Sequence, residues 1–249
     1  MNFLRRRIHR PLLHTNPVQM GEKYNKIILY IHMCWNETVS LNTFLFSSFV
    51  LLLIIYNNLF TKYKIQELNN NFIYLFIASF VVMQLIEFFI WKNINNKFYN
   101  KIFSIAATLL LIIQPIISIM ILSNIQLRNM LISLYLLFAI PFSIYKFSTQ
   151  NIHSVISKTG HLDWKFFDIA PIISLVWLFF FIFSFIYEKK WVGLIFGLGT
   201  LLITFINYSH DQTMWSMWCW SVNSIMIYYA IYLLIYLPFL EKSMLLKEQ

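Results

Sequence analysis

The feature that most constrains this chain is a series of long apolar runs separated by short polar segments. A helix needs about 20 predominantly apolar residues to cross the hydrocarbon core of a bilayer. Seven runs meet this requirement, at 39–56, 72–91, 102–123, 127–145, 166–187, 191–208 and 214–240. Only 12% of the residues are charged, too few to cover a water-soluble surface. The sequence therefore predicts an all-α, polytopic membrane protein with a bundle of about seven transmembrane helices.

The polar segments divide the chain into three parts. Residues 1–32 form a basic N-terminal arm that we expect to be disordered, 33–240 form the seven-helix transmembrane domain, and 241–249 form a polar C-terminal tail. Three residues, 188–190, join the fifth and sixth runs, so these two helices are expected to be antiparallel neighbours. The longest connection, 146–165, leaves no room for a soluble domain, and no internal repeat is visible.

The charge distribution indicates orientation and partners. The 19 Lys and Arg residues give a net charge of +9 but are scattered over short loops, which excludes nucleic acid as a partner. The expected partner is the lipid bilayer. The chain is also expected to assemble, either with further copies of itself or with other membrane proteins. Twelve of the 19 lie on the N-terminal side, which predicts a cytoplasmic N-terminus, although residues 1–32 supply the entire excess.

Four of the polar residues inside the apolar runs are candidate site residues: Gln84, Glu87, Gln114 and Asn223. A charged carboxyl group in hydrocarbon costs about 2.5 to 3.5 kcal/mol, so Glu87 and its helix-face neighbour Gln84 should point into the bundle. Glu87 is either a carboxylate linked to a proton or cation, or a neutral, hydrogen-bonded group near the interface. Gln114 precedes Pro115, which predicts a kink beside a carbonyl without a backbone donor. Asn223 is the residue of the last run that carries an amide side chain.

Further polar and aromatic residues are predicted to lie together on the N-terminal face of the membrane. Six of them carry side chains that bind zinc in proteins, and these are His161, Asp163, His210, Asp211, Cys34 and Cys219. They show no H-x-x-x-H or H-E-x-x-H spacing, so an interfacial polar belt is the alternative and no cofactor is expected. Five tryptophans act either as interface anchors or as the wall of a hydrophobic site, namely Trp35, Trp164, Trp215, Trp218 and Trp220.

Five short motifs occur in a characteristic order: MCWNETVSLNTF, MQLIEFF, a QP pair, HLDW and WSMWCW. With them the chain resembles an uncharacterised family of small seven-helix membrane proteins of microbes and large DNA viruses, whose members begin at the equivalent of Met33. A composition typical of an AT-rich genome agrees with a viral or microbial source. The resemblance implies seven helices and no assigned activity. It directs attention to Cys34, Trp35, Glu87, Gln114, Pro115, His161, Trp164, Trp218, Cys219 and Trp220.

Three functions fit the pattern. The first is a channel, carrier or sensor with a polar intramembrane chamber lined by Glu87, Gln114 and Asn223. The second is an intramembrane metal-dependent enzyme that modifies lipids, and the third is a structural or assembly protein of a viral or organellar membrane. A non-enzymatic role is favoured. A retinal protein is excluded because the last run, 214–240, contains no lysine, and an alkaline-ceramidase type of hydrolase is disfavoured because this run has no H-x-x-x-H pair.

Overall fold

The computed structural model describes residues 36–61 and 64–239, so the predicted N-terminal arm and C-terminal tail lie outside the described residues. Within them, six helices are long and apolar enough to cross a membrane, and a seventh apolar helix is shorter. This confirms the prediction of an all-α, polytopic helical bundle. The helices are α2 (Glu37–Phe60), α3 (Asn71–Lys92), α4 (Lys97–Ile119), α5 (Ile125–Thr149), α6 (Pro171–Tyr187), α7 (Trp191–Tyr208), α8 (Met214–Val222) and α9 (Ile225–Ile231).

Short elements connect or extend these helices. Strands β1 (Val155–Ile156) and β2 (Leu162–Asp163) form an antiparallel hairpin in which Val155 pairs with Asp163. The remaining elements are the 3-10 turns η1 (Gln66–Leu68), η2 (Lys165–Phe167) and η3 (Ser209–Asp211), and one π-helical turn, η4 (Tyr232–Tyr236). The fifth apolar run was predicted to be helical from residue 166, but α6 begins only at Pro171, because a proline is favoured in the first helical turn and not inside a helix.

An asparagine caps the N-terminus of each of the helices α2, α3, α4 and α5. The side chains of Asn36, Asn70, Asn96 and Asn124 each accept a hydrogen bond from a backbone N–H in the first turn of the following helix. These donors have no partner within the helix, so an Asn cap satisfies groups that would otherwise be unpaired. The loop sequences therefore determine where the helices start.

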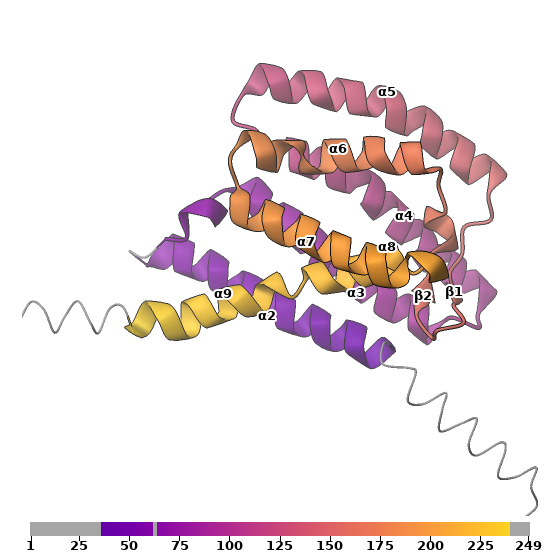
Figure 1. The fold of residues 1–249 in the computed structure, drawn as a ribbon, viewed down its shortest axis with the longest axis horizontal. Helices are drawn as coiled ribbons and strands as arrows, with labels where there is room; N and C mark the ends of the chain where they lie inside the picture. The colour runs from indigo at the N-terminus through magenta and orange to yellow at the C-terminus, as the bar shows by residue number, and fades with distance from the viewer. Residues whose placement is uncertain (1–35, 62–63, 240–249) are drawn as a thin grey trace, which may run out of the picture.

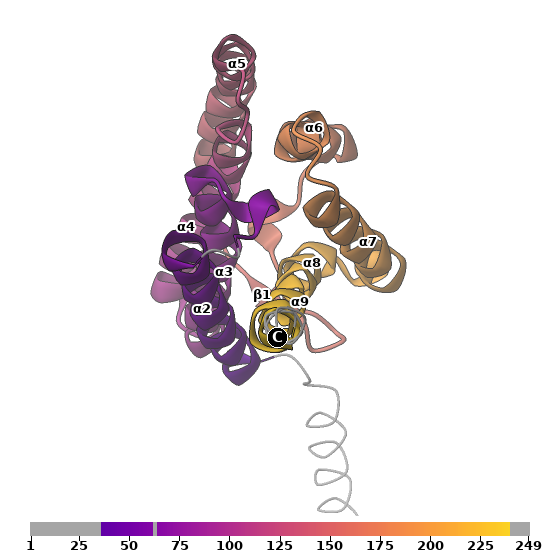
Figure 2. The same cartoon turned by 90° about the vertical axis from the view of Figure 1, so that its left-hand side faces the viewer.

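The bundle has two layers. Figure 2 shows α2, α3, α4 and α5 in one layer and α6, α7, α8 and α9 in the other. Contacts across the layers join α4 to α6, α3 to α8 and α2 to α9. Figure 1 shows the β-hairpin at one end, together with the starts of α2, α6 and α8, and we name this the hairpin end. The opposite end, with η1 and the α4–α5 and α6–α7 connections, is named the far end.

A proline determines how α4 contacts its neighbours. Pro115 lies inside α4 and has no backbone N–H to donate to the carbonyl of Leu111. The indole of Trp177 on α6 donates to this carbonyl oxygen at 2.8 Å, and the Tyr135 hydroxyl on α5 donates to the adjacent Ile112 carbonyl at 2.8 Å. The free carbonyl predicted beside Pro115 thus becomes an attachment point for the second layer.

The last apolar run forms one span that is broken midway. Between α8 and α9, the backbone N–H of Asn223 bonds to the Trp220 carbonyl and that of Met226 to the Asn223 carbonyl, each at 3.0 Å, in the tighter i to i+3 pattern. Carbonyl groups in this region accept side-chain bonds instead: Asn223 Nδ2 donates to Cys219 O at 2.7 Å and Ser221 Oγ to Trp218 O at 3.2 Å. The break lies beside a cavity.

Candidate functional site

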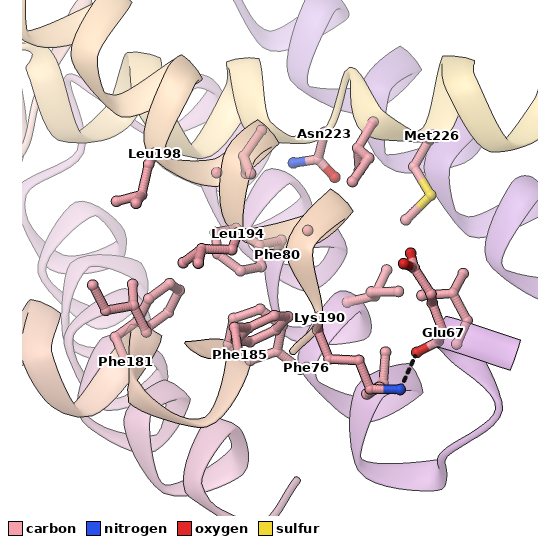
Figure 3. A pocket seen from close by; sticks show the side chains of 18 of the residues that line it. Glu67, Phe76, Phe80, Phe181, Phe185, Lys190, Leu194, Leu198, Asn223 and Met226 are labelled. Atoms are coloured by element: carbon pink, nitrogen blue, oxygen red, sulfur yellow. Dashed lines mark hydrogen bonds between the residues drawn. The ribbon is translucent and has the colours of Figure 1, made fainter. Parts of the chain in front are cut away.

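An aromatic pocket lies between the two layers, bounded by α3, α6, α7 and the broken α8–α9 span (Figure 3). Its cavity volume is about 90 Å³. Its main walls are aromatic, with Phe76 and Phe80 on α3, Phe181 and Phe185 on α6, and Trp218 on α8. The rings of Phe76 and Phe185 lie 4.9 Å apart, and the Trp218 ring meets Phe181 at 5.6 Å. The pocket therefore offers a rigid apolar surface.

Two charged residues line the pocket at the far end. Lys190, which precedes α7, donates from Nζ to the backbone carbonyl of Glu67 in η1 at 2.9 Å (Figure 3). Asn58 holds η1 in place, because its Oδ1 accepts the Ile65 N–H at 2.8 Å and its Nδ2 donates to the Tyr74 hydroxyl at 2.8 Å. The ammonium group and the Glu67 carboxyl group thus form a polar mouth on an apolar pocket.

The inner part of the pocket reaches the break in the last span. Asn223 lines it and is only 4% exposed, and its Oδ1 has no hydrogen-bond partner in the structure. Figure 3 shows the Asn223 side chain projecting from this helix toward the residues that line the pocket. Buried amide oxygens are nearly always hydrogen-bonded. This atom is consequently an unpaired acceptor, itself enclosed by protein atoms, at the inner part of the pocket.

A groove on the side of the bundle borders the pocket. It runs between α6 and α7 and has a volume of about 540 Å³. Its lining is mainly apolar, with side chains such as Leu175 and Leu202. Leu198 lines both the groove and the aromatic pocket. The pocket and the groove on the side of the bundle therefore share one lining side chain.

A second, smaller cavity contains Glu87 near the hairpin end. Its lining comes from Ser40, Glu87, Trp91, Leu162, Ser216, Met217 and Trp220. Gln84 Nε2 donates to Glu87 Oε2 at 2.9 Å, and the indole of Trp164 lies beside the same carboxyl group, with no closer partner for its own N–H. Glu87 is 4% exposed. The carboxyl group is therefore enclosed by polar neighbours under the hairpin.

The β-hairpin is fastened over this cavity from two sides. Ser216 Oγ on α8 donates to the carbonyl of Leu162 in β2 at 2.6 Å. On the other side, Asn100 of α4 accepts the Ser154 backbone N–H at Oδ1 (2.9 Å) and donates to the Ser154 carbonyl (3.0 Å), while Ser104 and Ser154 share a hydroxyl bond of 2.9 Å. These bonds give the hairpin a defined position above Glu87.

The predicted intramembrane residues do not all share one cavity. Gln84 and Glu87 lie together, but Asn223 lines the aromatic pocket and not the Glu87 cavity. Gln114 is completely buried in α4, lines neither cavity, and has no hydrogen-bond partner at Oε1 or Nε2 among the described residues. The three residues predicted to line one polar chamber thus lie in three different places in the bundle.

The potential metal ligands are dispersed. Asp163 forms a 2.6 Å ion pair with Lys165, and His161 lies edge-on to the Tyr208 ring at 5.2 Å. Burial lowers the pKa of the His161 imidazole, and the Asp211 carboxylate opposes that shift. His210 is exposed and Cys219 is a buried free thiol, while Cys34 lies outside the described residues. Within 36–61 and 64–239, no three His, Cys, Asp or Glu side chains could hold a metal ion together.

The tryptophans of the WSMWCW motif contact other helices. The Trp218 indole donates to the Gly197 carbonyl on α7 at 3.1 Å, and the Trp220 indole donates to Thr43 Oγ1 on α2 at 3.0 Å. Trp215 packs against Trp218 with ring centroids 6.0 Å apart. Trp164 is 4% exposed, and Trp35 lies outside the described residues. Trp218 is thus part of the pocket wall.

Sequence reasoning missed the mouth of the pocket and most of its wall. Lys190 was interpreted only as a loop charge, and Glu67 was not considered. One signal was present: Phe76 and Phe80 on α3, like Phe181 and Phe185 on α6, are spaced i to i+4 and so share a helix face. Two such pairs in separate helices are consistent with a common aromatic surface.

The fold and site define a polytopic helical membrane protein with an aromatic intramembrane pocket. Comparison with protein-family models, with curated proteins and with solved structures finds no match.

Proposed function

We propose that this protein is a membrane carrier or sensor that binds a single-chain amphiphile in the aromatic pocket. The observation that carries the proposal is the break in the last span at the inner part of the pocket, where Asn223 Oδ1 is buried without a partner. Irregular backbone at membrane depth occurs where it is buried in protein or lines a cavity, and broken helices form binding sites in many transporters.

The distribution of polar groups supports an amphiphilic ligand. The apolar body of the ligand would lie against the phenyl rings of Phe76, Phe80 and Phe181, where apolar surface leaves water and lipid. Its polar head would lie at the far end, where Lys190 supplies a cation for an anionic group. A hydroxyl or amide on the ligand, or a bound water, would donate to Asn223 Oδ1.

The lateral groove supports loading from the bilayer. A single-chain lipid could enter between α6 and α7 past Leu198 and reach the pocket without crossing water. A pocket that runs from Lys190 at the far end to Trp218 on α8 fits a binding protein better than an open pore. This favours a carrier or sensor over a channel.

A pair of glycines on α7 offers a matched test. Gly197 lines the pocket, Gly199 does not, and a Cβ atom at either position meets nothing within 4 Å. The full chain is reconstituted in phosphatidylcholine nanodiscs, and binding of a dansyl-labelled fatty acid is followed by energy transfer from tryptophan. We expect Gly197→Leu to fill the pocket and weaken binding by about tenfold, a loss of about 1.4 kcal/mol. Gly199→Leu should bind like the unaltered protein.

Two results would contradict the proposal. The first is equal affinity of Gly197→Leu and Gly199→Leu for the fatty acid when both variants have the same unfolding midpoint. The second is saturable binding that survives Gly197→Leu but is lost when the groove is filled by Leu202→Trp, because the ligand would then occupy the lateral surface.

A further inference from the structure

We infer that the cavity beneath the β-hairpin is a proton-binding site, with Glu87 as the group that holds the proton. This site is separate from the aromatic pocket and does not depend on the proposed function. It is built from α2, α3, α8 and β2, whereas the pocket uses α3, α6, α7 and the α8–α9 span. The two sites can therefore be tested independently.

The first support is the environment of the carboxyl group. Glu87 is 4% exposed, and its direct partner is the neutral Gln84 amide at 2.9 Å. The described residues form one ion pair, between Lys165 and Asp163. No basic side chain among them therefore lies within ion-pair distance of Glu87. A buried carboxylate without a counter-ion is strongly disfavoured, and a bound proton removes the charge.

The second support is the cavity itself. Glu87 shares its lining with the side chains of Ser40 and Ser216, so the carboxyl group faces a space with hydroxyl groups. The cavity volume is about 20 Å³, which is enough for one water molecule. Gln84 Oε1 is buried without a partner, so the amide that donates to Glu87 keeps an unused acceptor. A single water or a carboxyl proton suits this arrangement better than a metal ion.

The surrounding charges leave the proton as the counter-charge. Cys219 on α8 is buried and lies close enough to sense the charge on Glu87, but a thiol cannot neutralise it. The Asp163 carboxylate on the hairpin is paired with Lys165 at 2.6 Å. The other charged groups of the elements around the cavity are exposed at the hairpin end, and these are Glu37 of α2, Lys92 of α3, and Lys97 and Lys101 of α4.

The lining of the cavity includes residues near the hairpin end of the bundle. These are the buried Leu162 of β2 and the partly exposed Trp91 and Trp220. A proton bound at Glu87 is therefore expected to exchange with the aqueous phase on that side, through the cavity and past the hairpin. When Glu87 takes up the proton, its O–H bond forms as an O–H bond of a hydronium ion breaks, and release of the proton to water is the reverse.

Infrared difference spectroscopy tests the site directly. The full chain in phosphatidylcholine nanodiscs at neutral pH should show the C=O stretch of a protonated carboxylic acid, shifted on transfer to D2O. We expect the Glu87→Gln variant to lose this band and the Glu67→Gln variant to keep it. Gln84→Leu should retain the band at higher frequency, because the hydrogen bond from Nε2 to the carboxyl oxygen is lost.

One result of the infrared experiment supports the proton site at Glu87, and two results would contradict it. If Glu87→Gln does not fold, the frequency change in Gln84→Leu still assigns the band to Glu87. Absence of any protonated carboxyl band in the unaltered protein at neutral pH would overturn the inference. So would a band that disappears when NaCl replaces choline chloride at constant pH, because a metal cation would then occupy the site. Fatty-acid binding does not enter any of these measurements.

Discussion

The indole nitrogen of Trp177 on α6 donates to the carbonyl oxygen of Leu111 on α4 at 2.8 Å, in place of the backbone donor that Pro115 lacks. A side chain of one layer thus completes the backbone hydrogen bonding of the other. Trp177 and Pro115 should therefore be energetically coupled, because a substitution of either residue changes the hydrogen bonding of the Leu111 carbonyl.

This coupling gives the first prediction. Trp177→Phe keeps an aromatic ring but leaves the buried Leu111 carbonyl unpaired, and we expect it to lower the free energy of unfolding by about 1–3 kcal/mol. In a Pro115→Ala background the restored backbone N–H can pair with that carbonyl, so the same substitution should cost less. Unfolding in mixed micelles of the four proteins of this double-mutant cycle measures the difference. Strictly additive losses would refute the coupling.

The second prediction concerns the turn between α6 and α7. Lys189 has φ of 55°, in the left-handed region that costs a non-glycine residue roughly 1–2 kcal/mol. We expect Lys189→Gly to raise the free energy of unfolding by about 1 kcal/mol, measured in the same micelles. Lys158→Gly, at an exposed position without a positive φ, should give no gain. Equal effects of the two variants would show that the backbone at Lys189 is not strained.

The third prediction concerns the attachment of the hairpin. Asn100→Ala removes both bonds to the Ser154 backbone, at 2.9 and 3.0 Å, and leaves buried backbone groups unpaired. Hydrogen exchange followed by mass spectrometry should show faster exchange in peptides covering 151–164. Asn124→Ala is the control, because it removes an Asn that caps α5 at the far end. Equal exchange of the hairpin in both variants would rule out Asn100 as its anchor.

The fourth prediction follows from the mouth of the aromatic pocket. Lys190→Met should weaken binding of the dansyl-labelled fatty acid by about tenfold, and binding of the corresponding uncharged fatty alcohol much less. The neighbouring Lys189→Gln variant removes an equal charge from an exposed position outside the pocket lining and should change neither affinity. If both ligands lose affinity equally in Lys190→Met, the ammonium group does not recognise the head group.

The fifth prediction is a pH dependence at the hairpin. Burial lowers the pKa of His161 in the folded protein below its ordinary value of 6.5, so the unfolded hairpin binds the proton more tightly. The neutral His161 imidazole therefore contributes fully to the stability of the hairpin above pH 6.5, and this contribution is lost as the pH falls below 6.5. The protection of 151–164 against hydrogen exchange, corrected for the intrinsic exchange rate at each pH, should fall over this range in the unaltered protein. This loss of protection should vanish in His161→Gln and persist in His153→Gln.

The sequence predicted much of the helical fold because apolar runs and proline have local effects. The run at 72–91 became α3 (Asn71–Lys92), and Pro115 left a free carbonyl, as its missing N–H requires. The donor to that carbonyl, Trp177, was not predicted, since it lies 66 residues away from Leu111. The hairpin was also missed, because strands of two residues, such as Leu162–Asp163, carry no alternating pattern.

The candidate sites were predicted less completely. The spacing of Gln84 and Glu87 placed them on one helix face, where their side chains do form a hydrogen bond. Asn223 was grouped with Glu87 because both are polar and intramembrane. Their separation into two cavities depends on the break after Val222, where side chains compete for backbone carbonyls, and a long apolar run does not reveal such a break.

The interruption at Asn223 divides the last span into two helical segments, α8 and α9, and both of them border the pocket. The α8 segment is tied to the hairpin through Ser216 and to α2 through Trp220, and α9 packs on α2 as well. A molecule in the pocket therefore touches both segments, through Trp218 on α8 and Met226 on α9. We expect occupancy of the pocket to change the angle between the two segments, because the interruption lies between the residues that the molecule contacts.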